Sequence, residues 1–259
     1  MGRSNRRRER RADVEVTASN ARRLPPPKPQ WRETFDSWGG FPIFGSLAGI
    51  LVLVVVLIYM NRAGASTNTA PYEPTARTPV AGRVVGDPNA PVKIIEFADF
   101  QCPFCKQWAD GVEPKVYEEF IAKGVASLQY VSFAFLGEDS KRAAAAAECA
   151  ADQNRFWDFH DLLFLRQGKE NSGVFTNSNL KKFGLELRGK FADFDTGKFD
   201  QCVDSGAKNA AVETQTNQAR SAGVQSTPSF LVNGTPISGV QPIEVFRTAI
   251  DNAQKAASK

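Results

Sequence analysis

Two cysteines separated by two residues constrain this chain more than any other feature of its sequence. The run Cys102-Pro103-Phe104-Cys105 directly follows a short apolar strand, predicted over 92–98, and opens a predicted helix. A thiol in the first turn of a helix faces unpaired backbone N–H groups and the positive end of the helix dipole, and both favour the thiolate. Because the thiolate is the nucleophile of disulfide exchange, the pattern predicts a redox-active dithiol.

The net charge of +4 belongs entirely to the N-terminal part of the chain. Residues 1–40 carry ten basic and five acidic residues, whereas residues 41–259 carry 22 basic and 23 acidic ones. Nucleic-acid binding would require a folded basic module beside the arginines, and the apolar stretch that follows at once provides none. We therefore expect residues 1–40, with Pro25-Pro26-Pro27, to be a disordered cytoplasmic tail and exclude nucleic acid as a partner.

Residues 41–60 form an apolar stretch without a single charged residue. As a helix rising about 1.5 Å per residue, this stretch spans about 30 Å, the thickness of a bilayer's hydrocarbon core. The basic tail precedes it, so the positive-inside rule keeps the N-terminus in the cytoplasm and the rest of the chain outside. We predict a single-pass anchor in a bacterial cell membrane. Cleavage as a signal sequence near Ala63-Gly64-Ala65 is the alternative, and a periplasm is not distinguished from a single-membrane exterior.

The remaining chain is predicted to be one α/β domain on a linker. Residues 61–84 are rich in Gly, Ala, Ser, Thr, Asn and Pro, which is typical of an extracytoplasmic linker. The body is then 85–259, the usual size of a single domain. Its predicted order is a strand at 92–98, a helix from 102 to 123 kinked at Pro114, a strand at 125–136, helices over 138–222, an Asn-Gly hairpin at 229–237 and a helix at 241–257.

Two segments of this body carry a family resemblance. Residues 97–105, Phe-Ala-Asp-Phe-Gln-Cys-Pro-Phe-Cys, and residues 223–230, Gly-Val-Gln-Ser-Thr-Pro-Ser-Phe, together closely resemble the DsbA family of thiol–disulfide oxidoreductases. The resemblance covers most of 85–259 and implies a thioredoxin-like fold with an inserted helical domain at about 138–222. It implies no metal or organic cofactor. A zinc site would also need a second ligand pair, and His160 lies in no ligand motif, so we expect a structural or surface histidine.

The expected roles of the site residues follow from position and from this resemblance. Cys102 is expected to be the exposed attacking thiol, with a pKa lowered into the range of roughly 3.5–7.5, and Cys105 the more buried resolving thiol. Glu96 matches the family's buried acid that relays protons to Cys105; its apolar neighbours disfavour the alternative of a solvated surface carboxylate. Thr227-Pro228 matches the family's cis-proline, which leaves the Thr227 backbone free to pair with an extended peptide.

Phe104 departs from the best-known member of the family, which has histidine at this position. Phenylalanine can neither donate a hydrogen bond to the neighbouring sulfur nor carry charge beside it, so we expect a weaker oxidant. It also adds apolar surface that, with Pro103 and Thr227, is expected to contact substrate proteins.

Cys149 and Cys202 lie on separate predicted helices of the insertion. Two lone thiols are not expected to stay free in an oxidising compartment, so we predict a structural disulfide between them. Buried free cysteines remain the alternative, because the sequence does not show whether their Cα atoms come within bonding distance.

The sequence therefore predicts a membrane-anchored, extracytoplasmic thiol–disulfide oxidoreductase that oxidises cysteine pairs in unfolded or exported proteins. The family resemblance suggests that a quinone-linked membrane partner of the DsbB or VKOR type reoxidises it, and we expect a monomer. Two alternatives remain. The same site could serve a reductase or isomerase, for example in cytochrome c assembly, or the body could be a non-enzymatic, chaperone-like module that binds clients.

Overall fold

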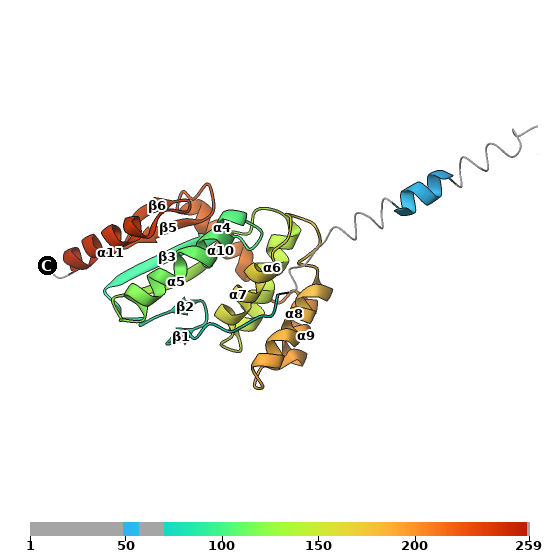
Figure 1. The fold of residues 1–259 in the computed structure, drawn as a ribbon, viewed down its shortest axis with the longest axis horizontal. Helices are drawn as coiled ribbons and strands as arrows, with labels where there is room; N and C mark the ends of the chain where they lie inside the picture. The colour runs from blue at the N-terminus through green and yellow to red at the C-terminus, as the bar shows by residue number, and fades with distance from the viewer. Residues whose placement is uncertain (1–48, 57–69, 258–259) are drawn as a thin grey trace, which may run out of the picture. The chain divides into compact units, whose positions relative to one another are not determined.

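The computed structural model describes residues 49–56 and 70–257 (Figure 1). The expected tail, most of the expected anchor and the first part of the expected linker lie outside these residues. Residues 49–56 are helical. Within the described ranges, no helix combines the length and the apolar character that crossing a membrane requires.

One mixed sheet lies at the centre of the body formed by residues 70–257. Its strands are β1 (Val80–Ala81), β2 (Val84–Val85), β3 (Val92–Ala98), β4 (Ala126–Ser132), β5 (Ser229–Val232) and β6 (Thr235–Ser238). They follow the order β1-β2-β4-β3-β5-β6, in which β3 and β4 are parallel and the other neighbours antiparallel. The two parallel strands are central and almost wholly buried, as expected for strands covered on both faces.

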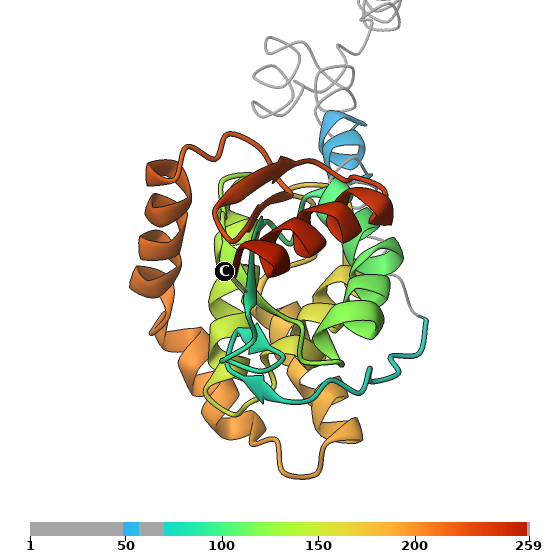
Figure 2. The ribbon, with the colours of Figure 1, turned by 90° about the vertical axis from the view of Figure 1, so that its left-hand side faces the viewer.

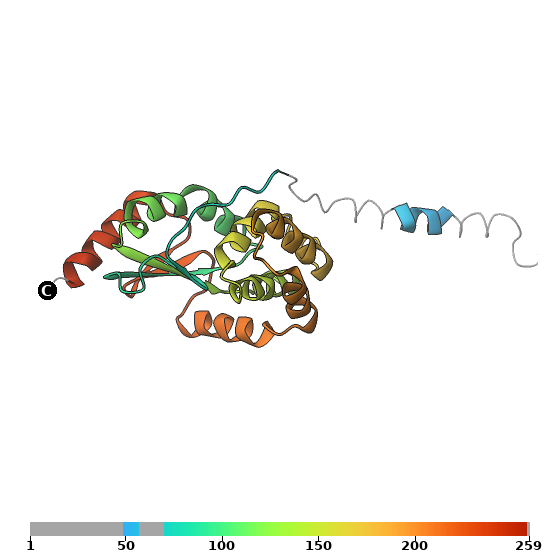
Figure 3. The same cartoon turned by 90° about the horizontal axis from the view of Figure 1, so that it is seen from below.

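Helices cover both faces of this sheet (Figure 3). One face carries α4 (Pro103–Gly111), α5 (Glu113–Val116) and α11 (Ile243–Ala257), and the other carries α10 (Asn209–Ser221). Side chains alternate along β3, so Glu96 points to the first face and Phe97 to the second. On the first face Trp108, Phe230 and Phe246 form an aromatic cluster with ring centroids 4.4–5.1 Å apart.

The long helix predicted after the cysteines is broken in the structure. α4 ends at Gly111, α5 begins at Glu113, and a π-helical turn, Tyr117–Ile121, completes the run. Pro114 lies in the first turn of α5, where its missing N–H costs no hydrogen bond, which explains why the break falls just before it. Gly124 then turns the chain toward β4 with a φ of 70°, a conformation that glycine adopts readily.

Five helices follow β4 along the chain before β5 begins (Figure 2). They are α6 (Glu138–Ala151), α7 (Phe156–Arg166), α8 (Asn177–Lys190), α9 (Thr196–Ser205) and α10. The buried alanines of α6 let its neighbours α7 and α9 approach closely. Gly184 in α8 serves the same purpose, because a Cβ there would come within 2.7 Å of the Phe199 ring in α9.

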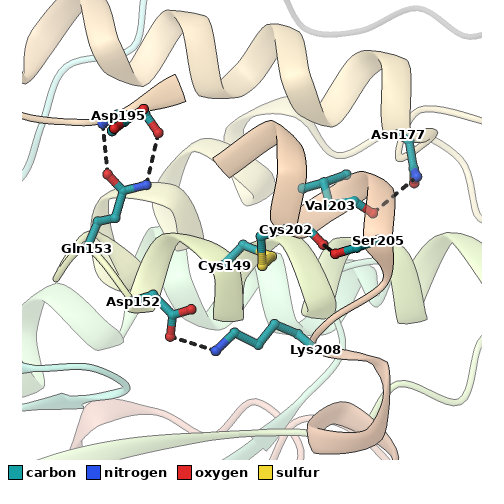
Figure 4. The surroundings of a disulfide bond; sticks show 9 residues. All are labelled: Cys149, Asp152, Gln153, Asn177, Asp195, Cys202, Val203, Ser205 and Lys208. Carbon is teal, nitrogen blue, oxygen red and sulfur yellow. Dashed lines mark hydrogen bonds and ion pairs between the residues drawn. A yellow bond between two sulfur atoms is a disulfide. The ribbon is translucent and has the colours of Figure 1, made fainter. Parts of the chain in front are cut away.

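A disulfide joins Cys149 of α6 to Cys202 of α9 (Figure 4). The two Cα atoms are 5.9 Å apart, and 53 positions separate the residues in sequence. Close by, the Gln153 amide accepts a hydrogen bond from the Asp195 backbone N–H at 2.7 Å and donates one to its carbonyl at 3.1 Å. The end of α6 is thereby tied to α9 at two points, by the covalent bond in the second half of α9 and by the polar contacts at its start.

The folded body begins earlier than the expected residue 85. Residues 70–84 were assigned to the linker, but they contribute β1 and pack against the body. We call residues 70–79 the strap. Its Tyr72 is only 3% exposed, and its Arg77 forms ion pairs with Glu113 at 2.7 Å and Asp161 at 2.6 Å. The small polar residues around these two side chains concealed their burial at the sequence level.

Candidate active site

The two cysteines lie at the C-terminal end of the central strands. Cys102 is the N-cap residue of α4, and its Sγ lies 3.4 Å from the carbonyl oxygen of Thr227, to which the thiol donates. The peptide bond between Thr227 and Pro228 is cis and directly precedes β5. Because β5 pairs with β3, the two motifs predicted from sequence meet at one end of the sheet.

Cys102 is less exposed than expected. It retains 5% of its accessible surface, whereas Cys105, one turn further along α4, retains none. The order of exposure agrees with the expected roles. The contact with Thr227 partly covers the Cys102 sulfur, while Phe104 between the two cysteines remains 60% exposed.

The two free thiols differ strongly in acidity. A hydrogen bond from the Cys105 thiol is the main reason that the pKa of Cys102 falls to about 6. Burial opposes the change, and the side chain of Thr227 and the backbone N–H groups of Phe104 and Cys105 support it. Burial, followed by the neighbouring Cys102, holds the pKa of Cys105 well above its ordinary value. Cys102 is therefore the thiolate of the reduced pair, and Cys105 keeps its proton.

Glu96 is fully buried beneath the dithiol. It lies next to Tyr130 in the parallel register of β3 and β4. Among the described residues, no hydrogen bond of ordinary geometry reaches either carboxyl oxygen or the nearby indole nitrogen of Trp108. Burial first, and then the negative charge of Glu113, raise the pKa of Glu96 well above its ordinary value, with Trp108 and Arg77 acting in the opposite direction.

The Glu96 carboxyl is also linked electrostatically to the resolving cysteine. A charged Glu96 raises the pKa of Cys105 further. A carboxyl that holds its proton in this position can give it to a Cys105 thiolate and later take it back. The geometry thus supports proton exchange between these two groups.

Asp99 is a buried residue beside the cysteine motif that sequence reasoning did not single out. It lies in the turn between β3 and Cys102 and is 2% exposed. Its Oδ1 accepts from the Gln101 N–H at 2.9 Å and the Ser140 hydroxyl at 2.6 Å, and its Oδ2 accepts from the N–H groups of Phe135 and Leu136 at 3.1 and 3.2 Å. A carboxylate directly after an apolar strand and before the cysteines was the available signal.

The helical insertion also holds the cysteine-bearing turn. Gln167, at the end of α7, donates to the carbonyl oxygens of Phe100 at 2.8 Å and Cys102 at 3.0 Å. The Gln101 amide donates to Ser140 of α6 at 2.8 Å. The backbone that presents Cys102 is therefore fixed from two helices of the insertion.

A buried cluster of charged residues, which the sequence did not predict, lies beside the site. Arg77 contacts both Glu113 and Asp161; His160 approaches Asp161 through Nδ1 at 2.9 Å and Glu113 through Nε2 at 3.8 Å. We call these four residues the Arg77 cluster. His160, expected to be structural or at the surface, is fully buried. Its position in a run of aromatic residues gave no sign of these carboxylate neighbours.

The chain is similar to known proteins in both sequence and structure. The profile of the family described as Thioredoxin matches residues 78–252. The chain is 36% identical over 152 residues to the "Probable disulfide bond formation protein D" of Bacillus anthracis, covering 58% of this chain and 69% of that protein. It is 28% identical over 174 residues to the "Disulfide bond formation protein D" of Bacillus subtilis, covering 66% and 77%.

Solved structures of such proteins also match this chain. The crystal structure of oxidised BdbD from Bacillus subtilis matches with a TM-score of 0.61 and 27% identity, covering 68% of this chain and 94% of that one. DsbA from Chlamydia trachomatis matches in fold with a TM-score of 0.57 at 21% identity, covering 71% and 98%. The chain therefore belongs to the thioredoxin family and is a DsbA-like protein thiol–disulfide oxidoreductase.

Proposed function

We propose that this oxidoreductase acts as an oxidase, which converts cysteine pairs of unfolded or exported proteins into disulfides through Cys102 and Cys105. The observation that carries the proposal is the stabilised thiolate of Cys102 at the start of α4, with its pKa lowered to about 6 mainly by the Cys105 thiol. A thiolate at Cys102 exists only in the reduced enzyme. Stabilising it favours the dithiol over the disulfide and so makes the disulfide form an oxidant.

The first step is attack by a client thiolate on the Cys102 sulfur of the enzyme disulfide. The Cys102–Cys105 bond breaks as the client–Cys102 bond forms, and Cys105 leaves as a thiolate. Glu96 then gives its proton to the Cys105 sulfur, which prevents Cys105 from attacking back. The buried, protonated carboxyl next to Cys105 supports this assignment.

The second step releases the product. The second client thiolate attacks the client sulfur of the mixed disulfide, a client disulfide forms, and Cys102 leaves as a thiolate. The client has then given two electrons to the enzyme and its two thiol protons to solvent. The enzyme is left reduced, with a thiolate at Cys102, a thiol at Cys105 and an ionised Glu96. During reoxidation Glu96 takes the proton back from Cys105, whose thiolate displaces the oxidising partner from Cys102.

Client recognition is proposed to use the backbone at Thr227 and the surface of the cysteine motif. An extended client segment beside the Thr227-Pro228 bond would place its cysteine against Cys102, because the Cys102 sulfur already contacts the Thr227 carbonyl. Phe104 and Pro103 would supply apolar contact, which the 60% exposure of Phe104 supports.

The proposed location is the outer side of a bacterial membrane, with residues 41–60 as the anchor and the N-terminus in the cytoplasm. The disulfide between Cys149 and Cys202 supports an oxidising compartment. We propose a quinone-linked membrane partner of the DsbB or VKOR type as the reoxidase, because tethering would raise its effective concentration near the enzyme.

The test is oxidation of reduced, unfolded ribonuclease by the enzyme in its disulfide form. Wild-type protein is expected to restore ribonuclease activity, and Cys102→Ala to leave only the uncatalysed rate. A reduction potential as low as that of thioredoxin, about −270 mV, would contradict the oxidase assignment and favour a reductase. Rescue of scrambled ribonuclease without net oxidation would favour an isomerase. Suppression of client aggregation that is undiminished in Cys102→Ala, without any oxidation by the wild type, would favour a chaperone-like module.

A further inference from the structure

Glu113 is a further buried carboxyl group, and the mechanism above does not use it. It lies in the first turn of α5 and is 1% exposed. Its Oε1 forms the ion pair with Arg77 at 2.7 Å. Its Oε2 has no hydrogen-bond partner among the described residues and faces His160 Nε2 at 3.8 Å. A buried, half-satisfied carboxylate is costly, so its presence requires an explanation other than stability.

The charge balance of the Arg77 cluster bears directly on Glu96. The cluster brings the two carboxyl groups of Glu113 and Asp161 to opposite sides of the Arg77 guanidinium. It lies in a buried region, where interactions between charges are weakly screened. Two rings connect Glu113 to Glu96: His160 Nε2 faces Glu113 Oε2 at 3.8 Å, and the His160 ring meets Tyr130 edge-on with centroids 5.4 Å apart. Tyr130 is in turn the strand neighbour of Glu96. In agreement with this placement, the charge of Glu113 opposes ionisation of Glu96.

The groups around Glu96 can be assigned to each packed element. They are Cys105 and Trp108 from α4, Glu113 from α5, Arg77 from the strap, Tyr130 from β4, and Phe230, the register partner of Glu96 on β5. α11 contributes the uncharged ring of Phe246, which packs on Trp108 and Phe230. Arg77 and Glu113 form an ion pair and act on the Glu96 carboxyl in opposite directions.

We propose that Glu113 is a positioning residue for disulfide exchange: its carboxylate, held in place by Arg77, keeps Glu96 protonated until Cys105 leaves. This inference rests on the proton-transfer role of Glu96 in the proposed function. Glu113 touches neither sulfur and acts only through the charge state of Glu96. Arg77 fixes the Glu113 carboxylate and moderates its effect, so that Glu96 can also lose its proton.

The cluster also reaches the surface. Arg77, Asp161 and Tyr72 line a surface cleft of about 440 Å³ whose walls come from the strap, the run from α4 to the π-helical turn, and α7. Asp161 therefore connects His160 and Arg77 to the edge of the protein, whereas Glu113 does not line the cleft. Burial opposes ionisation of Asp161, but the hydrogen bond from His160 and the charge of Arg77 hold its pKa below the ordinary value.

The experiment is single-turnover reduction of the Cys102–Cys105 disulfide by dithiothreitol, followed by acid quench and alkylation across a range of pH. After correction for the thiolate fraction of the reagent, the rate constant should fall at high pH as Glu96 loses its proton. Glu113→Gln removes the neighbouring negative charge, so the fall should move to lower pH by about one unit. Arg77→Met leaves Glu113 without its cation and should move the fall to higher pH.

Matched variants separate this role from a structural one. Glu119→Gln removes a surface carboxylate of the following helical turn, also paired with an arginine, and should leave the profile unchanged. Glu113→Asp keeps the charge and should restore the wild-type profile. Arg77→Met/Glu113→Gln removes both charges and should return the midpoint of the high-pH fall towards the wild-type value. This double variant also tests the proposal if Arg77→Met alone does not fold. Circular dichroism identifies any variant that has lost its fold.

Two outcomes overturn the proposal. A folded Glu113→Gln protein whose rate constant falls at the wild-type pH would exclude electrostatic control by Glu113. A shift of this midpoint in the same direction in Glu113→Gln and in Arg77→Met would indicate a general structural effect. A wild-type enzyme that fails to oxidise ribonuclease would instead contradict the proposed function. Persistence of the high-pH fall in Glu96→Gln would contradict the proton-transfer role itself, so the three failures are distinguishable.

Discussion

The sulfur of Cys102 lies 3.4 Å from the carbonyl oxygen of Thr227, although 125 positions separate the two residues in sequence. The contact forms because Thr227 ends the loop that leads into β5, and β5 pairs with the strand that leads to Cys102. A peptide that binds along Thr227 would therefore meet the attacking sulfur directly. The site of chemistry and the expected docking edge are fixed relative to each other by the sheet.

Thiolate formation at Cys102 should be visible in the reduced enzyme. The ultraviolet absorbance of the thiolate should titrate with a midpoint of about 6, because the Cys105 thiol and the start of α4 lower the pKa of Cys102. Cys102→Ser should abolish this transition. In the reduced enzyme, the thiolate's contribution to stability is complete above the unfolded value of about 8.5 and is lost as the pH falls through the folded value. A midpoint near that of a free thiol would contradict the assignment.

Replacing Phe104 should change the oxidising strength. Phe104→His places a group that can donate a hydrogen bond or carry positive charge beside Cys102, so the reduced form should gain stability. We expect the equilibrium constant with glutathione to shift about tenfold toward reduced enzyme, which corresponds to about 30 mV. Phe104→Leu is the control, because it is apolar like the native side chain and should leave the potential unchanged. The exposed position of residue 104 keeps both changes from disturbing the core.

Asp99→Asn should destabilise the protein and slow it. Both carboxylate oxygens accept two hydrogen bonds each, so an amide nitrogen at either position would face N–H or O–H donors. The expected loss is about 2–3 kcal/mol in urea unfolding, together with slower client oxidation because the turn before Cys102 loosens. Asp110→Asn, which removes an exposed carboxylate paired with Lys106 on α4, should cost less than about 1 kcal/mol.

Glu96→Gln should stabilise the fold while it slows the reaction. Because burial raises the pKa of Glu96, its favourable contribution is complete below the unfolded value of about 4.3 and is lost as the pH rises through the folded value. The glutamine variant escapes this loss. Its melting temperature should exceed that of the wild type by more at neutral pH than in acid. An equal difference at both pH values would show that Glu96 is not held protonated by its surroundings.

The second disulfide should contribute stability without entering the chemistry. Opening the bridge between Cys149 and Cys202, which closes a loop with a sequence separation of 53, is expected to cost about 4 kcal/mol in the chain-entropy description. Cys149→Ala/Cys202→Ala should retain single-turnover oxidation below its melting temperature. Thiol counting of denatured, unreduced Cys102→Ala/Cys105→Ala should find no free thiol. Two free thiols would contradict the bridge.

The sequence predicted the start of α4 at the cysteine pair because its signals are local. The cysteine spacing, the preceding apolar strand and the proline in the first turn specify the start of α4 without knowledge of the rest. The family-level prediction of a thiol–disulfide oxidoreductase with a thioredoxin-like fold is confirmed by the comparisons. The interruption of the helix near Pro114 could also be predicted from that single residue, since proline lacks an amide hydrogen.

The residues that sequence reasoning missed are those whose partners are remote. Arg77 meets Glu113 36 positions later and Asp161 84 positions later, and no local pattern records such pairs. In the sequence, Asp99 looks like any polar residue that follows a strand. Its hydrogen-bond partners lie on α6 and on the loop that precedes α6, and no local pattern indicates them. Composition was misleading for residues 70–84, because one tyrosine and one arginine decide their packing while their neighbours are typical of a linker.

The strap has a consequence for where this enzyme can be cut. A shortened protein that begins at residue 85 would keep both cysteines of the motif, Glu96 and Pro228, and would match the domain that the sequence alone delimits. It would nevertheless lose Arg77 and leave Glu113 buried without its cation. The smallest chain that reproduces the native chemistry must therefore begin upstream of Tyr72, so a protease site or purification tag belongs before that residue.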